Sequence, residues 1–102
     1  MNRKELTYKV KDSIKSIDPN ARVILFGSKA RGDSKVSSDW DFLILTSKQA
    51  DEYIKRQIRD RVLDTELEAE EVISTIIFSQ EKWSDYQITP LYKNILKDGV
   101  EL

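Results

Sequence analysis

The chain has 102 residues, of which 39% are hydrophobic and 34% charged, and its formal net charge at pH 7 is -1. This length suits one compact domain over residues 1–102 with its own core, and the composition is too apolar for a disordered chain. No apolar run approaches the ~20 residues that a membrane span needs, and the segment from Met1 to Glu5 lacks the apolar stretch of a signal peptide. We therefore expect a single cytoplasmic domain without a membrane partner.

Cysteine and histidine are both absent. Their absence excludes disulfide frameworks, thiolate zinc sites and nucleophile systems that depend on histidine. Carboxylates remain as the strong candidates for metal ligands, and they suit hard cations such as Mg²⁺. The nearly balanced charge gives no overall basic field, so nucleic acid is not the leading partner.

The first half of the chain is predicted to run helix, strand, loop, strand. Apolar residues recur at helical spacing from about Lys4 to Ser16, and Pro19 ends that helix. The short apolar run 23–26 predicts a buried strand. A polar, turn-rich segment 28–38 follows, and the apolar run 40–45 predicts a second buried strand.

The second half adds two helical patterns and one strand. An amphipathic pattern predicts a helix from about Lys48 to Glu68, and the β-branched run from Val72 to Phe78 predicts a third strand. A terminal helix with Pro90 in its first turn would stop at Gly99. Small polar residues stand where helices should begin, and three of them are predicted N-caps: Ser47, Ser79 and Thr89. The order of elements predicts an α/β (α+β) fold with helices packed against a small mixed sheet.

A glycine and a serine stand at the end of the first predicted strand. Gly27 allows the backbone to approach a ligand closely, and Ser28, if it begins a helical turn, can direct its hydroxyl and N–H toward an anion. Lys29 and Arg31 would add positive charge beside that anion. These features are typical of a segment that binds the phosphates of a nucleotide.

Two carboxylates stand at the entrance of the second predicted strand. Residues two apart on a strand project to the same face, so Asp39 and Asp41 should present both carboxylates together, while Trp40 and Phe42 face the other way. A divalent cation would compensate the repulsion between them, and Mg²⁺ binds such pairs together with phosphate oxygens. With ten aspartates in 102 residues an Asp-x-Asp pattern alone is weak evidence. For the pair alone, solvated strand-end carboxylates are an equally good interpretation.

The combination is more specific than its parts. A Gly-Ser pair ends the first apolar strand, and an Asp-x-Asp pattern opens the second after ten intervening residues. This arrangement, over residues 26–45, resembles the signature of the minimal nucleotidyltransferases of the DNA polymerase β superfamily. The resemblance implies a palm-like nucleotidyltransferase fold in which Gly27 and Ser28 contact the phosphates. It further implies that Asp39 and Asp41 are catalytic and bind a two-ion Mg²⁺ site. The reaction would transfer a nucleoside monophosphate, with AMP from ATP as the leading case, to a hydroxyl acceptor.

The same resemblance implies a third carboxylate on a later strand. The predicted strand 72–78 contains none, but Glu70 and Glu71 stand just before it. We select Glu70 as the third catalytic and metal-binding residue, because it lies on the side of the strand alternation that carries Val72 and Ser74. Glu71 is the rival, and either residue could be a solvated loop charge. Without a third carboxylate, nucleotide binding could survive without metal-dependent turnover.

The resemblance also suggests what the chain acts on. Larger relatives carry an additional domain for which this length leaves no room, so the acceptor or a missing wall of the site would come from another protein or a second copy of this chain. Minimal members are often paired with a small helical HEPN-type protein in toxin–antitoxin systems, and some antitoxins adenylylate a tyrosine of that partner. Two hypotheses stay open: a Mg²⁺-dependent adenylyltransferase acting on a protein, and a non-catalytic module that binds nucleotide or partner.

Overall fold

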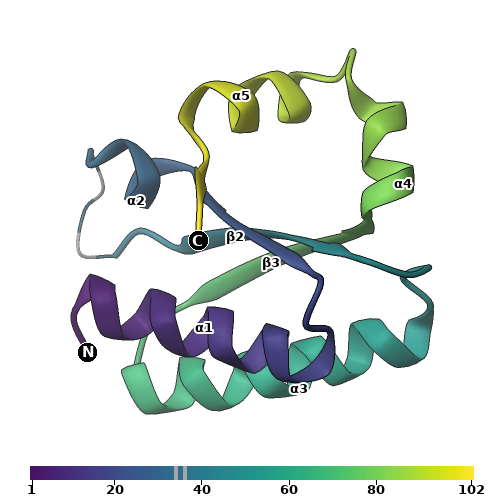
Figure 1. The fold of residues 1–102 in the computed structure, drawn as a ribbon. Coiled ribbons are helices and arrows are strands. Elements are labelled where there is room, and N and C mark those ends of the chain that lie inside the picture. The colour runs from purple at the N-terminus through teal and green to yellow at the C-terminus, as the bar shows by residue number, and fades with distance from the viewer. Residues whose placement is uncertain (34, 36) are drawn as a thin grey trace.

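The computed structural model describes residues 1–33, 35 and 37–102. Its centre is a mixed sheet with the strand order β3-β2-β1-β4 (Figure 1). The strands are β1 (Arg22–Phe26), β2 (Trp40–Thr46), β3 (Ile73–Ser79) and β4 (Val100–Glu101). The helices are α1 (Arg3–Ile17), α2 (Ser28–Arg31), α3 (Glu52–Ala69), α4 (Gln80–Trp83), the 3-10 helix η1 (Ser84–Tyr86) and α5 (Pro90–Asp98). None of the helices in these ranges is both long and apolar enough to cross a membrane.

The strand pairing brings three strands together at one end of the sheet. β1 runs antiparallel to both β2 and β4, whereas β2 and β3 are parallel and are joined by the crossover helix α3. In the observed register Phe26 of β1 lies opposite Asp41 of β2, and Asp41 lies opposite Ser74 of β3. The sheet is therefore mixed, as the order of elements predicted.

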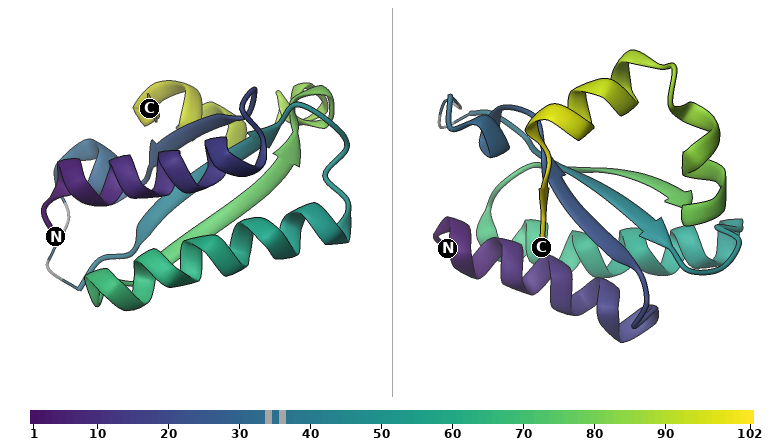
Figure 2. Two further views of the ribbon diagram at one scale, coloured as in Figure 1. Left: turned by 60° about the horizontal axis from the view of Figure 1, so that its bottom comes forward. Right: turned by 45° about the horizontal axis from the view of Figure 1, so that its top comes forward.

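Helices cover the two faces of the sheet unequally. α1 and α3 lie side by side across one face, whereas α4 and α5 form an arch over the other (Figure 2). Trp40 and Phe42 are buried in the main core with α1 and α3, and Trp83 is buried in a smaller core beneath the arch. The pleat of β2 thus sends Trp40 and Phe42 to the α1–α3 face and leaves Asp41 on the other.

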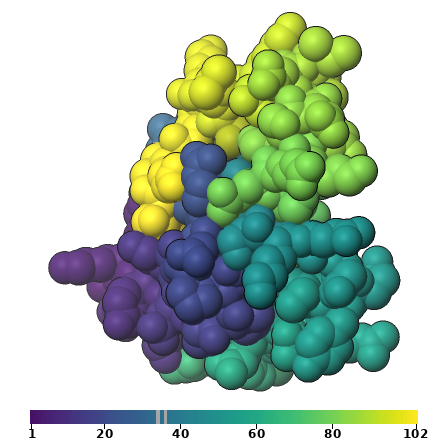
Figure 3. All heavy atoms as spheres, turned by 45° about the vertical axis from the view of Figure 1, so that its right-hand side comes forward, coloured from purple at the N-terminus to yellow at the C-terminus, as the bar shows by residue number. Residues whose placement is uncertain are grey.

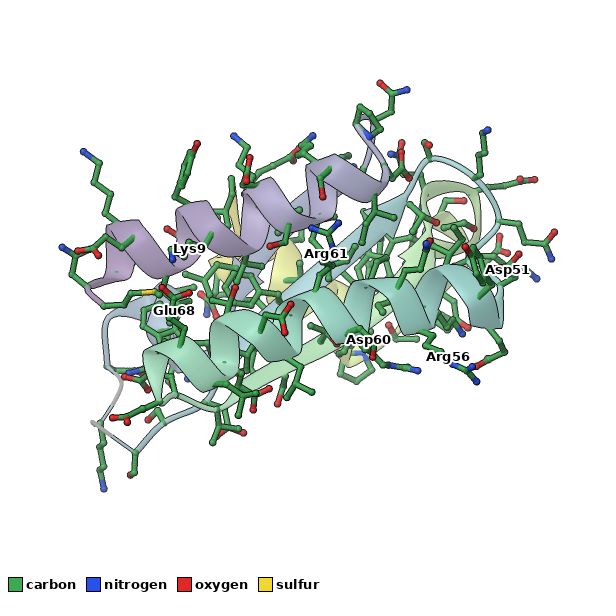
Figure 4. All side chains as sticks on the ribbon, turned by 90° about the horizontal axis from the view of Figure 1, so that it is seen from below. Lys9, Asp51, Arg56, Asp60, Arg61 and Glu68 are labelled. Atoms are coloured by element: carbon green, nitrogen blue, oxygen red, sulfur yellow. The ribbon has the colours of Figure 1, made fainter. Side chains whose placement is uncertain are left out.

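The two long helices contact each other through their apolar faces and one surface ion pair. Lys9 of α1 and Glu68 of α3 lie 2.6 Å apart, and Figure 4 shows their side chains between the two helices. Both side chains are about half exposed, so this ion pair contributes little to stability. The observed bounds of α1 extend the predicted helix by one residue at each end.

The predicted start of the long helix is wrong. α3 begins at Glu52, and its N-cap is Asp51, whose side chain accepts a hydrogen bond from the backbone of the first turn. Ser47 instead donates its N–H and its hydroxyl to the carboxylate of Asp18, at 2.8 and 2.7 Å. Because Asp18 holds Ser47 beside the end of α1, the chain leaves β2 as a loop before it can turn into a helix.

The other predicted caps are confirmed. Ser79 accepts a hydrogen bond from the N–H of Lys82 at 3.1 Å, and Thr89 accepts one from the N–H of Tyr92 at 3.2 Å. α5 ends immediately before Gly99, where the sequence predicted its stop.

β4 was not predicted. It has two residues, too few to carry a periodic pattern, and long-range contacts place it beside β1. Arg22 donates to Glu101 in a two-pronged ion pair at 2.7 and 3.0 Å, and the N–H of Leu102 donates to the carbonyl of Val23 at 2.9 Å.

The arch of α4 and α5 leaves a hollow against the sheet. Its volume is about 220 Å³, and its lining includes Arg22 and Ile24 of β1 together with Trp83 and Tyr92 of the arch. Figure 3 shows the two arms of the arch, coloured green and yellow, meeting over this face. No residue predicted to bind nucleotide or metal lines this cavity.

Candidate functional site

Gly27 sits where β1 turns into α2. Its φ of 76° and ψ of -160° belong to a conformation that side-chain-bearing residues rarely adopt. A Cβ atom at this position would also overlap Oδ2 of Asp41. Two independent constraints, the backbone angles and the approach of the Asp41 carboxylate, therefore require glycine here.

Ser28 begins a single helical turn, as expected. The carbonyl of Gly27 accepts hydrogen bonds from the N–H groups of Ala30 and Arg31, both at 3.1 Å, and Gly32 closes the turn in the left-handed region. The first N–H groups of such a turn have no partner within it. The turn that starts at Ser28 therefore leaves backbone donors next to the carboxylate of Asp41.

The two acids selected from the sequence lie near each other at the start of β2. Asp39 lies just before β2 and Asp41 lies within it, opposite Phe26 of β1. Burial, and then the negative charge of Asp39, raise the pKa of Asp41 above its ordinary value, while the positive charge of Arg31 offsets part of that shift. The site thus carries an excess of negative charge next to backbone donors.

These residues fit a metal-bound phosphate group. No group in the described part of the chain donates a hydrogen bond to Asp41, so its oxygens are not committed to another role. Mg²⁺ takes one or two carboxylates and fills its other positions with phosphate oxygens and water. Asp39 and Asp41 would supply the carboxylates, and the turn at Gly27 and Ser28 would contact the phosphates.

The two predicted basic residues have different surroundings. Arg31 lies near enough to Asp41 to influence its pKa, and its guanidinium also pairs with Asp33 at 3.1 Å and with Asp98 at 3.8 Å. Lys29 instead places its ammonium 4.9 Å from the ring centre of Trp40. Arg31 is therefore grouped with the acid pair, whereas Lys29 contacts the indole that faces the α1–α3 side.

The structure does not bring Glu70 to the acid pair. Glu70 caps the end of α3 in the left-handed region, with a φ of 54°, and the N–H groups of Glu70 and Glu71 both donate to the carbonyl of Glu66. Within residues 1–33, 35 and 37–102 no three acidic, histidine or cysteine side chains gather closely enough to hold a metal ion. A third-ligand role for Glu70, or for its rival Glu71, stays a prediction without geometric support here.

The side chain that does accompany the pair is Ser74, which the sequence analysis did not select. Its hydroxyl lies 3.5 Å from Oδ2 of Asp39, and its position on β3 is in register with Asp41. A signal was available in the sequence, because Ser74 is a lone small polar residue in a β-branched run and lies on the side of the alternation assigned to Glu70.

Comparison with known protein families identifies the family of this domain. A family model described as nucleotidyltransferase domain matches residues 7–101. The chain therefore belongs to the nucleotidyltransferase domain family, and its class of activity is that of a nucleotidyltransferase. A search of curated proteins found no match.

Two solved structures share the fold. One is a chain from the crystal structure of a toxin–antitoxin with AMP-PNP, with a TM-score of 0.66 and 15% identity over 98% of this chain and 72% of that one. The other is a chain from a mutant of the toxin–antitoxin MntA-HpeT, with a TM-score of 0.62 and 17% identity over 100% of this chain and 72% of that one. These likenesses confirm the predicted fold.

Proposed function

We propose that this protein transfers AMP from ATP, with Mg²⁺, to a hydroxyl of another protein, and that a tyrosine of a HEPN-type toxin is the leading acceptor. The observation that carries the proposal is the pairing of Asp39 and Asp41 against the turn at Gly27 and Ser28. A binding module that acts by surface contact alone has no physical need for an exposed and a half-buried carboxylate held together beside the first backbone donors of a helical turn.

The chain's own residues would bind and orient the nucleotide. Backbone N–H groups at Gly27 and Ser28 would hold phosphate oxygens, and Arg31 would add positive charge at the margin of the site. Mg²⁺ held by Asp39 and Asp41 would neutralise the phosphates and the leaving pyrophosphate. The acceptor oxygen would attack the α-phosphorus, the bond to pyrophosphate would break, and the acceptor proton would pass to water.

The two solved structures with a similar fold support a protein acceptor, because both come from toxin–antitoxin systems. Both solved structures are described as toxin–antitoxin systems, and one of them was crystallised with AMP-PNP, an analogue of ATP. We extend these descriptions to this chain as part of the proposal, together with a cytoplasmic location.

A second candidate is a module that binds nucleotide and partner without transfer. It is favoured by the observation that, in the described residues, a serine and not a carboxylate accompanies the acid pair. Such a site would hold a metal-bound nucleotide weakly and would lack a third group to complete the metal site.

Label transfer separates the two candidates. The protein is incubated with Mg²⁺ and a native cell lysate, once with α-³²P-labelled ATP and once with γ-³²P-labelled ATP. Transfer of AMP predicts label on a discrete protein with the α-label only, and none with the Asp39→Asn/Asp41→Asn variant. The matched control is Asp12→Asn/Asp60→Asn, which removes the same charge from exposed positions on α1 and α3.

The outcomes are distinct. Label on that protein from γ-labelled ATP and none from α-labelled ATP would indicate phosphoryl transfer and would contradict the proposal. No label, with nucleotide binding that depends on Mg²⁺ and on Asp39 and Asp41, would establish the non-catalytic module. Nucleotide affinity that responds neither to Mg²⁺ nor to the double substitution would exclude both candidates.

A further inference from the structure

The third strand that borders the acid pair contributes a neutral side chain. β2 and β3 run parallel with Asp41 opposite Ser74, so the side chains of these two residues share one face of the sheet. The hydroxyl of Ser74 reaches toward the other acid, at 3.5 Å from Oδ2 of Asp39, which is at the long end of the hydrogen-bond range. Ser74 is half-buried, and no other hydrogen bond of its hydroxyl occurs in the described part of the chain.

The backbone fixes this arrangement. The N–H of Trp40 donates to the carbonyl of Val72 at 2.9 Å, which locks the start of β3 to the start of β2. Glu70 and Glu71 precede that lock and belong to the C-terminal turn of α3. The register therefore presents position 74, and neither of the two glutamates, to the acid pair.

We propose that Ser74 is a positioning residue for Asp39: its hydroxyl donates to one carboxylate oxygen and leaves the other free to bind a cation. This inference rests on the proposed function, because it assigns a role within the same metal and nucleotide site. It also has a consequence for affinity. A site with two carboxylates and one hydroxyl binds a free divalent cation weakly and takes it up mainly as a complex with the nucleotide.

The inference is tested by changing the number of negative charges at position 74. A hydroxyl orients an anion without adding charge, whereas Ser74→Asp would place a third carboxylate beside the first two. The site of Ser74→Asp would then resemble the oxygen-rich sites that bind a divalent cation in the absence of a nucleotide. Ser74→Ala removes the donor and keeps the size of the side chain nearly unchanged, and Ser74→Thr keeps the donor.

The measurement is binding of Mn²⁺ alone, followed by electron paramagnetic resonance, and binding of Mg²⁺-ATP, followed by calorimetry. We expect Ser74→Asp to raise the affinity for free Mn²⁺ at least tenfold, because carboxylate number sets the affinity of such sites. We expect Ser74→Ala to lower the affinity for Mg²⁺-ATP roughly tenfold, as loss of a partner of a metal ligand does, and Ser74→Thr to restore it. Glu70→Gln and Glu71→Gln should leave both affinities unchanged.

Several results would overturn the inference. They are an unchanged Mg²⁺-ATP affinity in Ser74→Ala, an unchanged Mn²⁺ affinity in a folded Ser74→Asp, and a tenfold loss in Glu70→Gln or Glu71→Gln. Should Ser74→Asp fail to fold, as judged by its thermal transition, the Ser74→Ala and Ser74→Thr pair still decides.

The failure of this inference can be told apart from that of the proposed function. Label transfer that survives with normal nucleotide affinity in Ser74→Ala removes the role of Ser74 alone. The expected binding changes without any label transfer in the native protein remove the transferase proposal and leave Ser74 as a positioning residue of a binding module.

Discussion

Two half-buried aspartates at opposite ends of the sheet have opposite surroundings. Asp18 lies between α1 and β1 and accepts hydrogen bonds from the N–H and hydroxyl of Ser47 and from the N–H of Asn20. Burial alone would raise the pKa of Asp18, but these donors and nearby Lys15 outweigh it and lower that pKa. Asp41 receives no such donor from the described residues, so burial, and then the negative charge of Asp39, raise its pKa.

The difference separates a carboxylate that the fold satisfies from one that receives no hydrogen bond from the described residues. The fold itself satisfies Asp18, which ties the end of α1 to the loop after β2. The fold compensates the charge of Asp41 only in part, through Arg31, and a bound cation can compensate the rest. Four predictions test this contrast, from the largest expected effect to the smallest.

Catalysis should depend on one aspartate and not on the other. Asp41→Asn should reduce nucleotidyl transfer about 1000-fold, because the charge that holds the metal-bound phosphates is lost. Asp18→Asn should leave the rate unchanged. Initial rates of label transfer to the acceptor measure both, and equal losses in the two variants would show that the contrast has no functional meaning.

The glycine against Asp41 should be more sensitive than the glycine that ends the same turn. Gly27→Ala should lower the free energy of unfolding by about 1–3 kcal/mol and weaken nucleotide binding, because the backbone is strained and the new Cβ overlaps the carboxylate. Gly32 also has a positive φ, but nothing lies within 4 Å of a Cβ there, so Gly32→Ala should cost about 1 kcal/mol and spare binding. Urea unfolding and calorimetry would show whether the two variants differ.

A bound nucleotide should stabilise the protein only when Asp41 is charged. At a Mg²⁺-ATP concentration ten times the dissociation constant, the free energy of unfolding should rise by about 1.4 kcal/mol. The same concentration should leave the thermal transition of Asp41→Asn where it is. A shift of equal size in the variant would mean that the nucleotide binds elsewhere.

The same substitution should have opposite signs at the two aspartates in the metal-free protein. The lowered pKa of Asp18 contributes stability above the ordinary carboxyl pKa, so Asp18→Asn should destabilise by about 1 kcal/mol near neutral pH. The raised pKa of Asp41 opposes folding once the group is charged, so Asp41→Asn should stabilise.

Acid should remove both differences. The contribution of each charge is lost only where the carboxyl is protonated in both the native and the unfolded protein, which is below the lowered native pKa of Asp18 and below the ordinary, unfolded-state pKa of Asp41. Urea unfolding of the native protein and both variants, near neutral pH and in acid, gives the change in the free energy of unfolding for each variant at each pH. A destabilised Asp41→Asn near neutral pH would show that the carboxylate is satisfied in the fold.

Local patterns in the sequence were enough for most of the fold. The periodic apolar positions of α1 and the apolar runs of β1 and β2 are long enough to identify these elements, and the caps Ser79 and Thr89 act within a few residues. The Ser47 cap was wrong because a distant carboxylate, Asp18, binds that serine. Tertiary contacts of this kind have no local signal.

The same limit applies to the site. Gly27, Ser28, Asp39 and Asp41 lie in two short segments that one strand pair brings together, so their spacing predicted their grouping. The residue facing them from β3 depends on a parallel register that is set by where α3 ends. Sequence alternation identified the correct side of that strand but not that position 74 would be the one beside the pair.

The two strands that pair with β1 are synthesised at very different times. The segment that forms β2 follows it closely, whereas β4 comes only after α3, β3 and α5 have been made. Until then one edge of β1 has unpaired backbone groups that another chain could pair with. The pairing of Leu25 with Val100 is therefore a late, high-contact-order step, and the nascent protein should be most prone to aggregate before the ribosome releases that segment.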